Sequence, residues 1–240
     1  MVRVEAESAI VHSHFNIDTL VNDVAIILLP NGHEINLALG TVIPISRKPV
    51  SAGEAGFVAS WGFTTDNSNR ISENLMVARQ VVIENTACFQ QFERAVHRNQ
   101  FCAQDQSVKK ELEEPSEESS SSEETVEDPQ DEQQDQEQQE TEQQETEQNN
   151  RGNQPDYIPP IWEWNGFRQL TRSNGLSGVC RGDTGSAIIR KSEKGIVAIG
   201  IVSRVASTCD GEHPALYTSL SSFIQWITDA TLGAAVISDE

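Results

Sequence analysis

One stretch of this sequence is too polar to belong to a folded core. Residues 105–155 are rich in Glu, Gln and Ser and contain no aromatic residue and no cysteine. Residues 111–150 alone hold 17 Asp and Glu residues and no Lys or Arg. Such a segment buries too little apolar surface to offset its ordering entropy, and its like charges keep it extended. We therefore expect a disordered acidic insertion at 105–155, which divides the globular sequence into residues 1–104 and 156–240.

The insertion carries most of the charge of the chain. The formal net charge is −20, yet the residues outside 111–150 number 20 acidic and 17 basic, a net of −3. No basic cluster is present to neutralise phosphates, so we expect no nucleic-acid partner. No apolar run is long enough to span a bilayer, so we expect no membrane role. The insertion itself is either an arm that binds cations or proteins or a tolerated loop expansion, since closure entropy grows only logarithmically with length.

Short strand signals fill most of the remaining sequence. Apolar runs alternate with Gly, Pro and Asn turns, and Lys194-Gly195 is a hairpin signal. The expected strands are 2–11, 23–29, 42–45, 56–62, 75–83, 187–190, 196–203 and one that ends at Thr218. We expect residues 23–29 to be buried, residues 86–96 to form a helix with Thr86 as N-cap, and residues 221–230 to form an amphipathic closing helix. Regularly spaced short strands predict an all-β barrel or sandwich.

The cysteines leave their own pairing open. Cys88, Cys102, Cys180 and Cys209 allow three complete pairings. None has Cys-x-x-Cys spacing, so we expect no structural zinc site, and nothing else in the sequence implies a metal or cofactor. The even count fits disulfides in an oxidising compartment, and four buried free thiols fit about equally well. The first residues lack a basic segment followed by an apolar core, so we expect no signal peptide.

The turn at residues 179–187 carries the clearest chemistry. Gly182 and Gly185 flank Asp183-Thr184, so backbone N–H groups can approach a ligand without an intervening Cβ. Preorganised N–H donors beside a hydroxyl are what an oxyanion hole requires. With Cys180 before it, the turn resembles the Gly-Asp-Ser-Gly-Gly-Pro signature of chymotrypsin/trypsin-family serine proteases. The resemblance implies that Gly182 and Thr184 form the oxyanion hole and that Thr184 occupies the position of the nucleophilic serine.

Further stretches resemble the same family, in the family's order along the chain. They are Asn22–Ile27, Ser60-Trp61-Gly62, Phe101-Cys102-Ala103, Ile201-Val202-Ser203, Pro214-Ala215-Leu216-Tyr217 and the Trp226-Ile227 end. The resemblance implies an all-β, two-barrel chymotrypsin-like fold with a C-terminal helix. Residues 1–104 would hold an incomplete first barrel and the start of the second, and residues 156–240 the rest. It also implies the disulfides Cys88–Cys102 and Cys180–Cys209, each contributing ~3 kcal/mol, and an extracellular, secreted protein.

The catalytic residues depart from the family pattern. Peptide hydrolysis needs a hydroxyl nucleophile, a histidine base and an aspartate that orients the histidine. Similarity assigns Asp23 as that aspartate, but the family's Ala-Ala-His-Cys motif is absent from the sequence. His12 and His14 lie just before the Asp23 strand, where the family often has a non-catalytic histidine. The histidines expected on the surface are His33, His97 and His213.

The surroundings of the 179–187 turn also depart from the family pattern. In the family a free amino terminus pairs with the aspartate that Asp183 matches. The Ile/Val-Val-Gly-Gly motif that supplies this amino terminus is absent from the sequence. We therefore expect Asp183 to need water, another cation or a proton. Arg181-Gly182-Asp183 spells an adhesion tripeptide, but the resemblance turns Asp183 inward.

The resemblance also implies a specificity pocket. Gly178 forms its base, which gives no support for basic-residue specificity. Val205 and Ala215 narrow its walls, Ser203 contributes to it just before the substrate-binding strand, and Arg204 replaces an aromatic platform.

Three functional hypotheses follow from the sequence. The first is a secreted, non-catalytic serine protease homologue that binds proteins or peptides. The second is a fragment of an active serine endopeptidase whose histidine lies upstream of Met1. The third is an interaction protein whose acidic insertion binds the partner. Because a barrel cut open exposes strand edges and apolar surface, we expect this chain alone to fold poorly or partly.

Overall fold

The computed structural model describes residues 4–30, 42–93, 95–105, 168–169, 178–209 and 211–239. All of them belong to one compact unit of the chain. The acidic insertion expected at 105–155 lies outside the described residues, apart from Asp105, which ends a strand.

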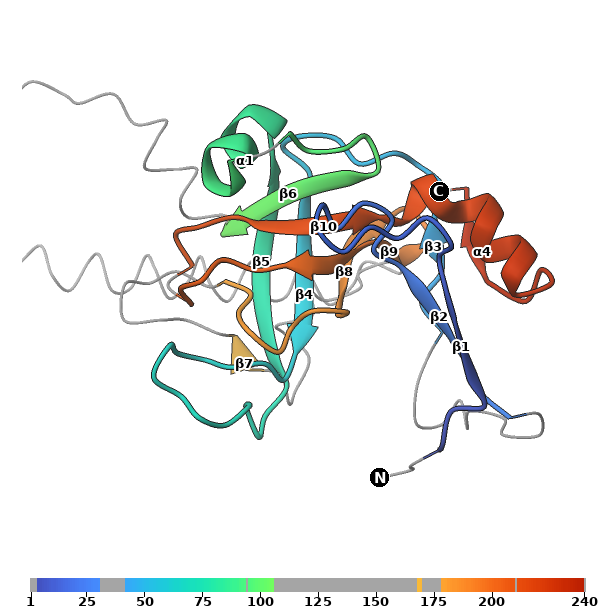
Figure 1. Ribbon diagram of the computed structural model, residues 1–240, viewed down its shortest axis with the longest axis horizontal. Coiled ribbons are helices and arrows are strands. Elements are labelled where there is room, and N and C mark those ends of the chain that lie inside the picture. The colour runs from blue at the N-terminus through green and yellow to red at the C-terminus, as the bar shows by residue number, and fades with distance from the viewer. Residues whose placement is uncertain are drawn as a thin grey trace, which may run out of the picture. The chain divides into compact units, whose positions relative to one another are not determined.

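Six antiparallel strands close into a barrel (Figure 1). They are β4 (Ala55–Ser60), β5 (Met76–Ile83), β6 (Gln100–Asp105), β8 (Ala187–Ser192), β9 (Gly195–Arg204) and β10 (Ala215–Ser219). The order β10-β6-β5-β4-β8-β9 is closed by pairing of β9 with β10. Strands in this barrel therefore come from both sides of the acidic insertion, and residues 1–104 and 156–240 fold together.

Local sequence explains the tightest connection of the barrel. The turn between β8 and β9 contains Lys194-Gly195, and Gly195 has φ +129°, a conformation that favours glycine. The hairpin predicted from this dipeptide is confirmed. It pairs Ser192 with Gly195 and continues to Ala187 opposite Ile201, with an irregularity between Ile188 and Ile189.

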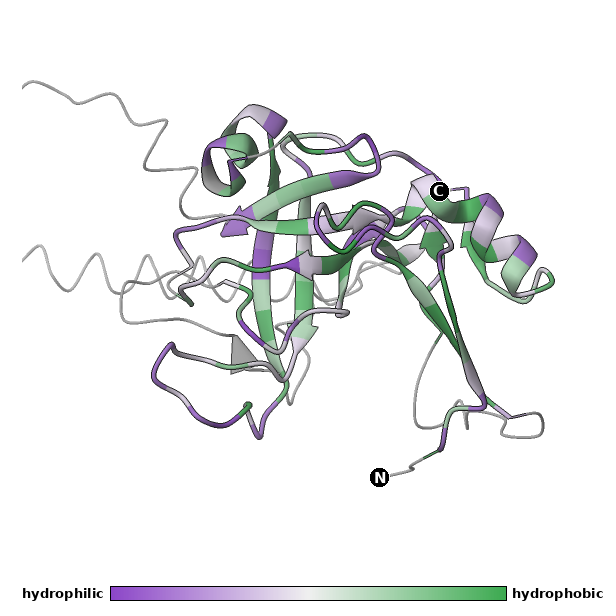
Figure 2. Ribbon diagram, in the orientation of Figure 1, coloured by the Kyte–Doolittle hydropathy of each residue, from purple (hydrophilic) through white to green (hydrophobic). Residues whose placement is uncertain are grey.

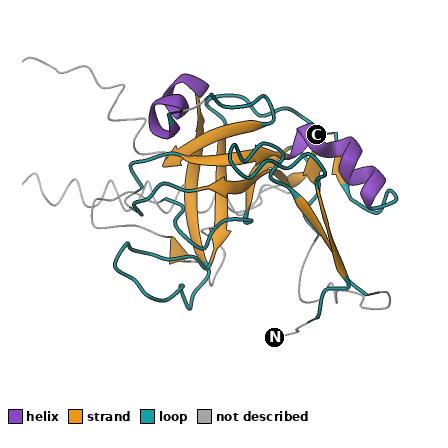
Figure 3. Ribbon diagram, in the orientation of Figure 1, coloured by secondary structure: helices purple, strands orange, loops and turns teal. Residues whose placement is uncertain are grey.

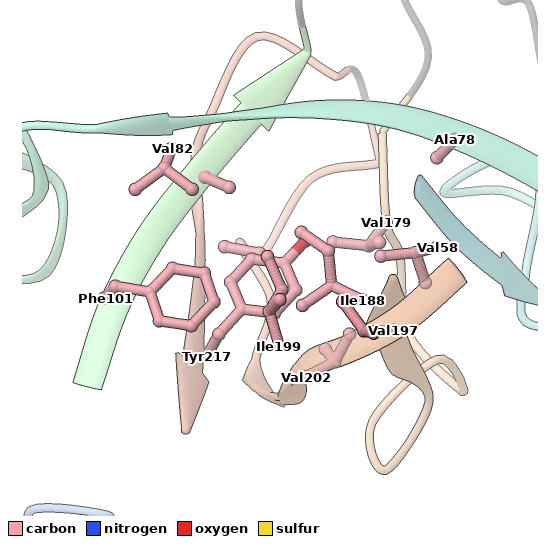
Figure 4. Packing of buried hydrophobic residues seen from close by; sticks show 12 residues of the cluster. Val58, Ala78, Val82, Phe101, Val179, Ile188, Val197, Ile199, Val202 and Tyr217 are labelled. Atoms are coloured by element: carbon pink, nitrogen blue, oxygen red, sulfur yellow. The ribbon is translucent and has the colours of Figure 1, made fainter. Parts of the chain in front are cut away.

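Apolar side chains fill the barrel interior (Figure 4). The Phe101 ring stacks on Tyr217 with centroids 5.2 Å apart and planes 8° apart. This packing needs Gly200, because a Cβ there would lie 2.7 Å from the Phe101 ring. The buried Tyr217 hydroxyl donates to Gln80 Oε1 over 3.3 Å, so its polar atom is satisfied inside the core.

Short parallel strands extend the barrel sheet. β3 (Ile45–Ser46) pairs with β9 and with β11 (Ile237–Ser238), and β7 (Arg168–Gln169) pairs with β5. Beside β3, the buried guanidinium of Arg190 pairs with Glu54 and also donates to Ser46 Oγ. A buried charge is tolerated when it is paired and hydrogen-bonded in this way.

The N-terminal part of the chain forms a separate two-stranded sheet. β1 (Ser8–Val11) pairs antiparallel with β2 (Ala25–Leu28). The end of this hairpin is fixed to the barrel: Asn99 Nδ2 donates to Asn22 Oδ1 over 2.6 Å, and Gln100 Nε2 donates to the Leu20 carbonyl over 2.8 Å.

The expectation that residues 23–29 form a buried strand is wrong. Ile27 is 67% exposed and Leu29 39% exposed, although Val24 is buried. A continuous apolar run indicates burial on both faces. In the structure only the face of Ile26 and Leu28 is partly covered, because no second sheet among the described residues packs on the face of Ile27.

Two helical segments lie outside the barrel (Figure 3). α1 (Asn85–Phe92) begins one residue before Thr86, and its N-cap is Glu84, which makes no side-chain cap bond. The predicted N-cap was therefore wrong. The closing helix is confirmed as a 3₁₀ turn, η2 (Leu220–Phe223), that runs into α4 (Ile224–Ala230).

Both implied disulfides are present in the structure. Cys88–Cys102 joins α1 to β6 with 5.8 Å between Cα atoms, and Cys180–Cys209 joins the 179–187 turn to the loop after β9 with 5.0 Å. Free cysteines are absent, since all four pair. The two bridges hold the predicted site and its flanking helix against the barrel.

Candidate active site

The 179–187 turn is tight and tied to the barrel. The N–H of Asp183 donates to the Cys180 carbonyl over 3.1 Å, and that of Ser186 donates to the Asp183 carbonyl over 3.0 Å. Gly182 and Gly185 adopt φ +85° and +91°, which is the reason for glycine at both positions. Gly185 N–H also donates to the Val202 carbonyl, so the turn is fixed to the end of β9.

The carboxylate of Asp183 points inward and is fully engaged. The side chain is 6% exposed; Oδ1 accepts the Gly62 N–H over 2.9 Å and Oδ2 accepts the Cys180 N–H over 2.8 Å. Two backbone donors therefore satisfy this carboxylate, in addition to the water, cation or proton that we expected it to need. Burial, with the negative charge of Asp183 as a smaller cause, raises the pKa of Tyr217.

A small cavity lies beside Asp183. Its volume is about 10 Å³, and Val58, Met76, Gly178 and Thr64 are among its lining residues. That is room for roughly one water molecule. Since Asp183 faces this interior, the Arg181-Gly182-Asp183 tripeptide does not present its acid to an external receptor, as expected.

Thr184 is exposed at the surface of the turn. Within the described part of the chain, its hydroxyl makes no hydrogen bond, and neither do the N–H groups of Gly182 and Thr184. Among the described residues, the two donors assigned to an oxyanion hole are thus unengaged, and no base contacts the hydroxyl beside them.

Asp23 is positioned by the barrel. Ser203 Oγ donates to its Oδ2 over 2.7 Å, and its backbone carbonyl accepts Thr218 Oγ1 over 2.9 Å. Asp23 and Ser203 are 180 residues apart in sequence. Sequence reasoning placed Ser203 in the specificity pocket and missed this bond, because no local pattern connects the two strands.

The described histidines lie elsewhere. The His12 ring packs edge-on to Phe223 (5.3 Å between centroids) and at a tilt to Trp226 (5.1 Å) on the closing helix. His14 is exposed next to it, and its N–H donates to His12 Nδ1. Burial, with His14 as a second cause, lowers the pKa of His12.

The remaining histidines were expected on the surface. His97 and His213 are exposed, as expected, and contact Asn99 and Thr208 respectively. His33 lies outside the described residues. In the part of the chain that is described, no histidine is a hydrogen-bond partner of Asp23 or Thr184.

The base of the predicted specificity pocket is closed by backbone. A Cβ at Gly178 would lie 2.7 Å from the Cα of Gly211, so the two glycines are in direct contact. Ala215 is 1% exposed, and Val205 packs against the barrel core. A side chain larger than glycine at position 178 would therefore clash with the backbone. Gly211 had no sequence signal that assigned it to the site.

The guanidinium groups of Arg204 and Arg181 each stack on an aromatic ring. The Arg204 guanidinium lies over Phe92 of α1, with 5.6 Å from Cζ to the ring centroid. Arg181 lies over Phe63 at 5.1 Å and donates from a guanidinium nitrogen to the Asp66 carbonyl over 2.9 Å. Neither ring was assigned to the site from sequence.

The described segments show neither a cluster of metal ligands nor a membrane-spanning helix. Across the described segments, no three His, Cys, Asp or Glu side chains gather as a metal site would require. No helix in those segments has the length and apolarity needed to cross a membrane.

Comparisons with known proteins agree with the barrel and the turn. The sequence model of the trypsin family matches residues 2–113 and 129–227. Trypsin from Xenopus laevis is 26% identical over 99 residues, and trypsins I-P1 and I-P38 from Gallus gallus are each 25% identical over 99. Each match spans 41% of this chain and 40% of the relative's length.

A solved structure shares the fold. It is neuropsin, a serine protease expressed in the limbic system of mouse brain, with a TM-score of 0.58 and 14% identity. The match covers 95% of this chain and 71% of neuropsin, and at that identity it shows a common fold. With the closed barrel, the Asp183 turn and a family match over most of the sequence, the chain belongs to the trypsin family of serine peptidase domains.

Proposed function

We propose that this trypsin-family chain is a non-catalytic homologue that binds proteins or peptides. The binding face is formed by the 179–187 turn and the C-terminal end of β9. The observation that carries the proposal is Thr184, which stands at the nucleophile position with no base at its hydroxyl among the described residues. A hydroxyl nucleophile is weak unless an adjacent base removes its proton.

The close packing at Gly178 supports the same proposal. Hydrolysis of a specific peptide bond needs a substrate side chain held in a fixed place, so that the reacting atoms are aligned. At the base assigned to hold that side chain, Gly178 packs closely against the backbone of Gly211 and offers no charged or polar side chain to fix a substrate. The extra methyl of Thr184 further restricts χ1 in the turn. Without a base, the oxyanion donors and binding alone give only about 10³–10⁴-fold acceleration over water.

Labelling with a fluorophosphonate active-site probe tests the proposal. The protein should be made from the longest transcript, next to Thr184→Ser and Thr184→Ala variants, with trypsin as the positive control. We expect no labelling of the natural chain. Labelling that Thr184→Ala abolishes would overturn the proposal, because it requires a working hydroxyl and base.

An active endopeptidase is the second candidate function, and two observations favour it. Asp23 is held by Ser203 through one carboxylate oxygen only, and the N–H groups of Gly182 and Thr184 are unengaged. A histidine from sequence upstream of Met1 would have to complete the site. Labelling of Thr184→Ser but not of the natural protein would show an intact site that the threonine silences, in favour of the non-catalytic proposal.

The location that best fits this function is extracellular. Both cysteine pairs are oxidised in the structure, and such bridges persist in secreted proteins and are reduced in the cytosol. We propose secretion on this ground. Detection of the oxidised protein in culture medium, by its mobility shift on reduction, would support secretion, and retention of the reduced chain in the cytosol would contradict it.

A further inference from the structure

Two exposed arginines flank the turn that presents Thr184. Arg181 follows Cys180 directly, and Arg204 is the last residue of β9. Val202 accepts the Gly185 N–H over 2.8 Å and donates its own N–H to Ser186 over 2.9 Å. The Cys180–Cys209 disulfide joins the same turn to the loop after Arg204. Two backbone hydrogen bonds and a disulfide therefore connect the segments that carry the two arginines.

Each of the two guanidinium groups is supported by a ring. Arg181 stacks over Phe63, and Arg204 stacks over Phe92. No carboxylate of the described residues pairs with either of them. Other arginines of the chain do have such partners: Arg190 pairs with Glu54, and Arg47 pairs with Asp239 at 2.7 Å. Both guanidinium groups are exposed and, within the described residues, have no carboxylate partner; apart from the donor that Arg181 gives to the Asp66 carbonyl, they keep N–H donors for an external acceptor.

The chemistry of the guanidinium group indicates which class of ligand the two arginines bind. The planar fork of arginine matches a carboxylate with two parallel hydrogen bonds, and a stacked arginine loses less side-chain freedom when it binds. A polyanion such as nucleic acid is disfavoured, because the chain as a whole carries −20 and presents two cations here instead of a basic stripe. Two separate carboxylates on a short protein segment fit two separate arginines, one carboxylate for each.

We infer that Arg181 and Arg204 form a clamp for an acidic peptide segment, which the chain binds across the Thr184 turn. This inference rests on the proposed binding function and assigns its partner class. The partner is a protein segment with at least two Asp or Glu residues, one for each arginine.

Peptide binding with matched variants tests the clamp. The probe is a fluorescein-labelled peptide of four Gly-Glu repeats, compared by fluorescence anisotropy with the same peptide of four Gly-Gln repeats. We expect the Glu peptide to bind at least tenfold more tightly. Arg181→Gln and Arg204→Gln should each weaken it at least fivefold and leave the Gln peptide unaffected. Arg204→Lys should give a smaller loss, because the charge remains without the fork.

The matched control is Lys194→Gln, which removes one positive charge at the opposite end of β9. This variant should bind the Glu-repeat peptide with an affinity within twofold of that of the natural protein. Equal binding of the two peptides, or equal losses in the Lys194 and Arg204 variants, would overturn the clamp. Circular dichroism of each variant verifies folding. Fluorophosphonate labelling of Thr184 would overturn the non-catalytic proposal without changing the peptide preference, so the two failures can be told apart.

Discussion

At the residue scale, Asp183 shows how this chain stabilises a buried charge. Its two oxygens each accept one backbone N–H, from Gly62 and Cys180, and a hydrogen bond to a charged group contributes about 1.5–3 kcal/mol. The turn that carries Thr184 therefore depends on an acid in the interior. Any variant that removes the carboxylate leaves two buried donors without partners.

Replacement of Asp183 tests this role. We expect Asp183→Ala to lower the free energy of unfolding by about 2–5 kcal/mol, and Asp183→Asn by less, because the amide keeps one acceptor oxygen. The measurement is urea denaturation followed by tryptophan fluorescence. Glu193→Gln in the exposed β8–β9 turn is the control, with a change within about 0.5 kcal/mol. Equal stability of the Asp183→Ala and Glu193→Gln variants would disprove the role.

His12 gives a prediction on pH. Burial and His14 lower its folded-state pKa below the ordinary value of 6.5. The unfolded chain then binds more protons around and below that pH, so the stability from neutral His12 is complete above 6.5 and is lost as the pH falls. We expect the urea midpoint to drop more on acidification from about pH 7.5 to about pH 5 in the natural protein than in His12→Phe.

His14→Gln separates the two causes of that shift. It removes the neighbouring cation but keeps the packing of His12 on Phe223 and Trp226. Its pH dependence should therefore fall between those of the natural protein and His12→Phe. If all three proteins lose stability in parallel, the burial of His12 does not couple folding to pH.

At the element scale, the β1–β2 hairpin is rich in hydrophobic residues (Figure 2), and one of its faces is exposed. Residues directly opposite on paired strands share a face, so the register places Val11 opposite Ala25 and Ala9 opposite Ile27 on one side of the sheet. Val11 is 58% and Ile27 67% exposed. A two-stranded sheet with open edges is a template for association with other chains.

We expect the double variant Val11→Thr, Ile27→Thr to aggregate less. Threonine keeps the preference for strands while it lowers the hydrophobicity of the exposed face. Static light scattering against protein concentration measures the effect. The control is Ile10→Thr, Ile26→Thr on the half-buried opposite face, which should lower the melting temperature instead. Scattering unchanged by the first double variant would show that this face does not drive association.

At the scale of the whole molecule, charge is divided unevenly. Residues 111–150 supply 17 of the 37 acidic residues, and the rest of the chain is close to neutral. Like charge lowers the local concentration of an anionic ligand around a protein, and salt screens this effect. The acidic insertion should therefore weaken binding of acidic peptides to Arg181 and Arg204 at long range.

Deletion of residues 111–150 tests this effect and changes the net charge from −20 to −3. At low ionic strength we expect the Glu-repeat peptide to bind the shortened chain more tightly than the full chain. The difference should shrink at about 1 M salt, where the Debye length is about 3 Å. Loss of all partner binding on deletion would instead support the hypothesis that the insertion is the binding arm.

Sequence by itself determined the local features of this protein. The β8–β9 hairpin follows from Lys194-Gly195 and the apolar runs on either side, and the closing helix from its periodicity. Motif resemblance gave the two disulfides, the barrel fold and the inward Asp183. These predictions succeeded because each depends on residues close together in the chain, or on motifs that the family shares.

Tertiary structure decided what fills and surrounds the site. Gly62 and Asp183 are 121 residues apart, and Asp23 and Ser203 are 180 apart, so no local pattern could pair them. Contact between Gly178 and Gly211 likewise depends on two loops that only the closed barrel brings together. The exposure of Ile27 was wrongly predicted, since hydrophobicity shows that a side chain favours burial and only the packed neighbours decide whether it is buried.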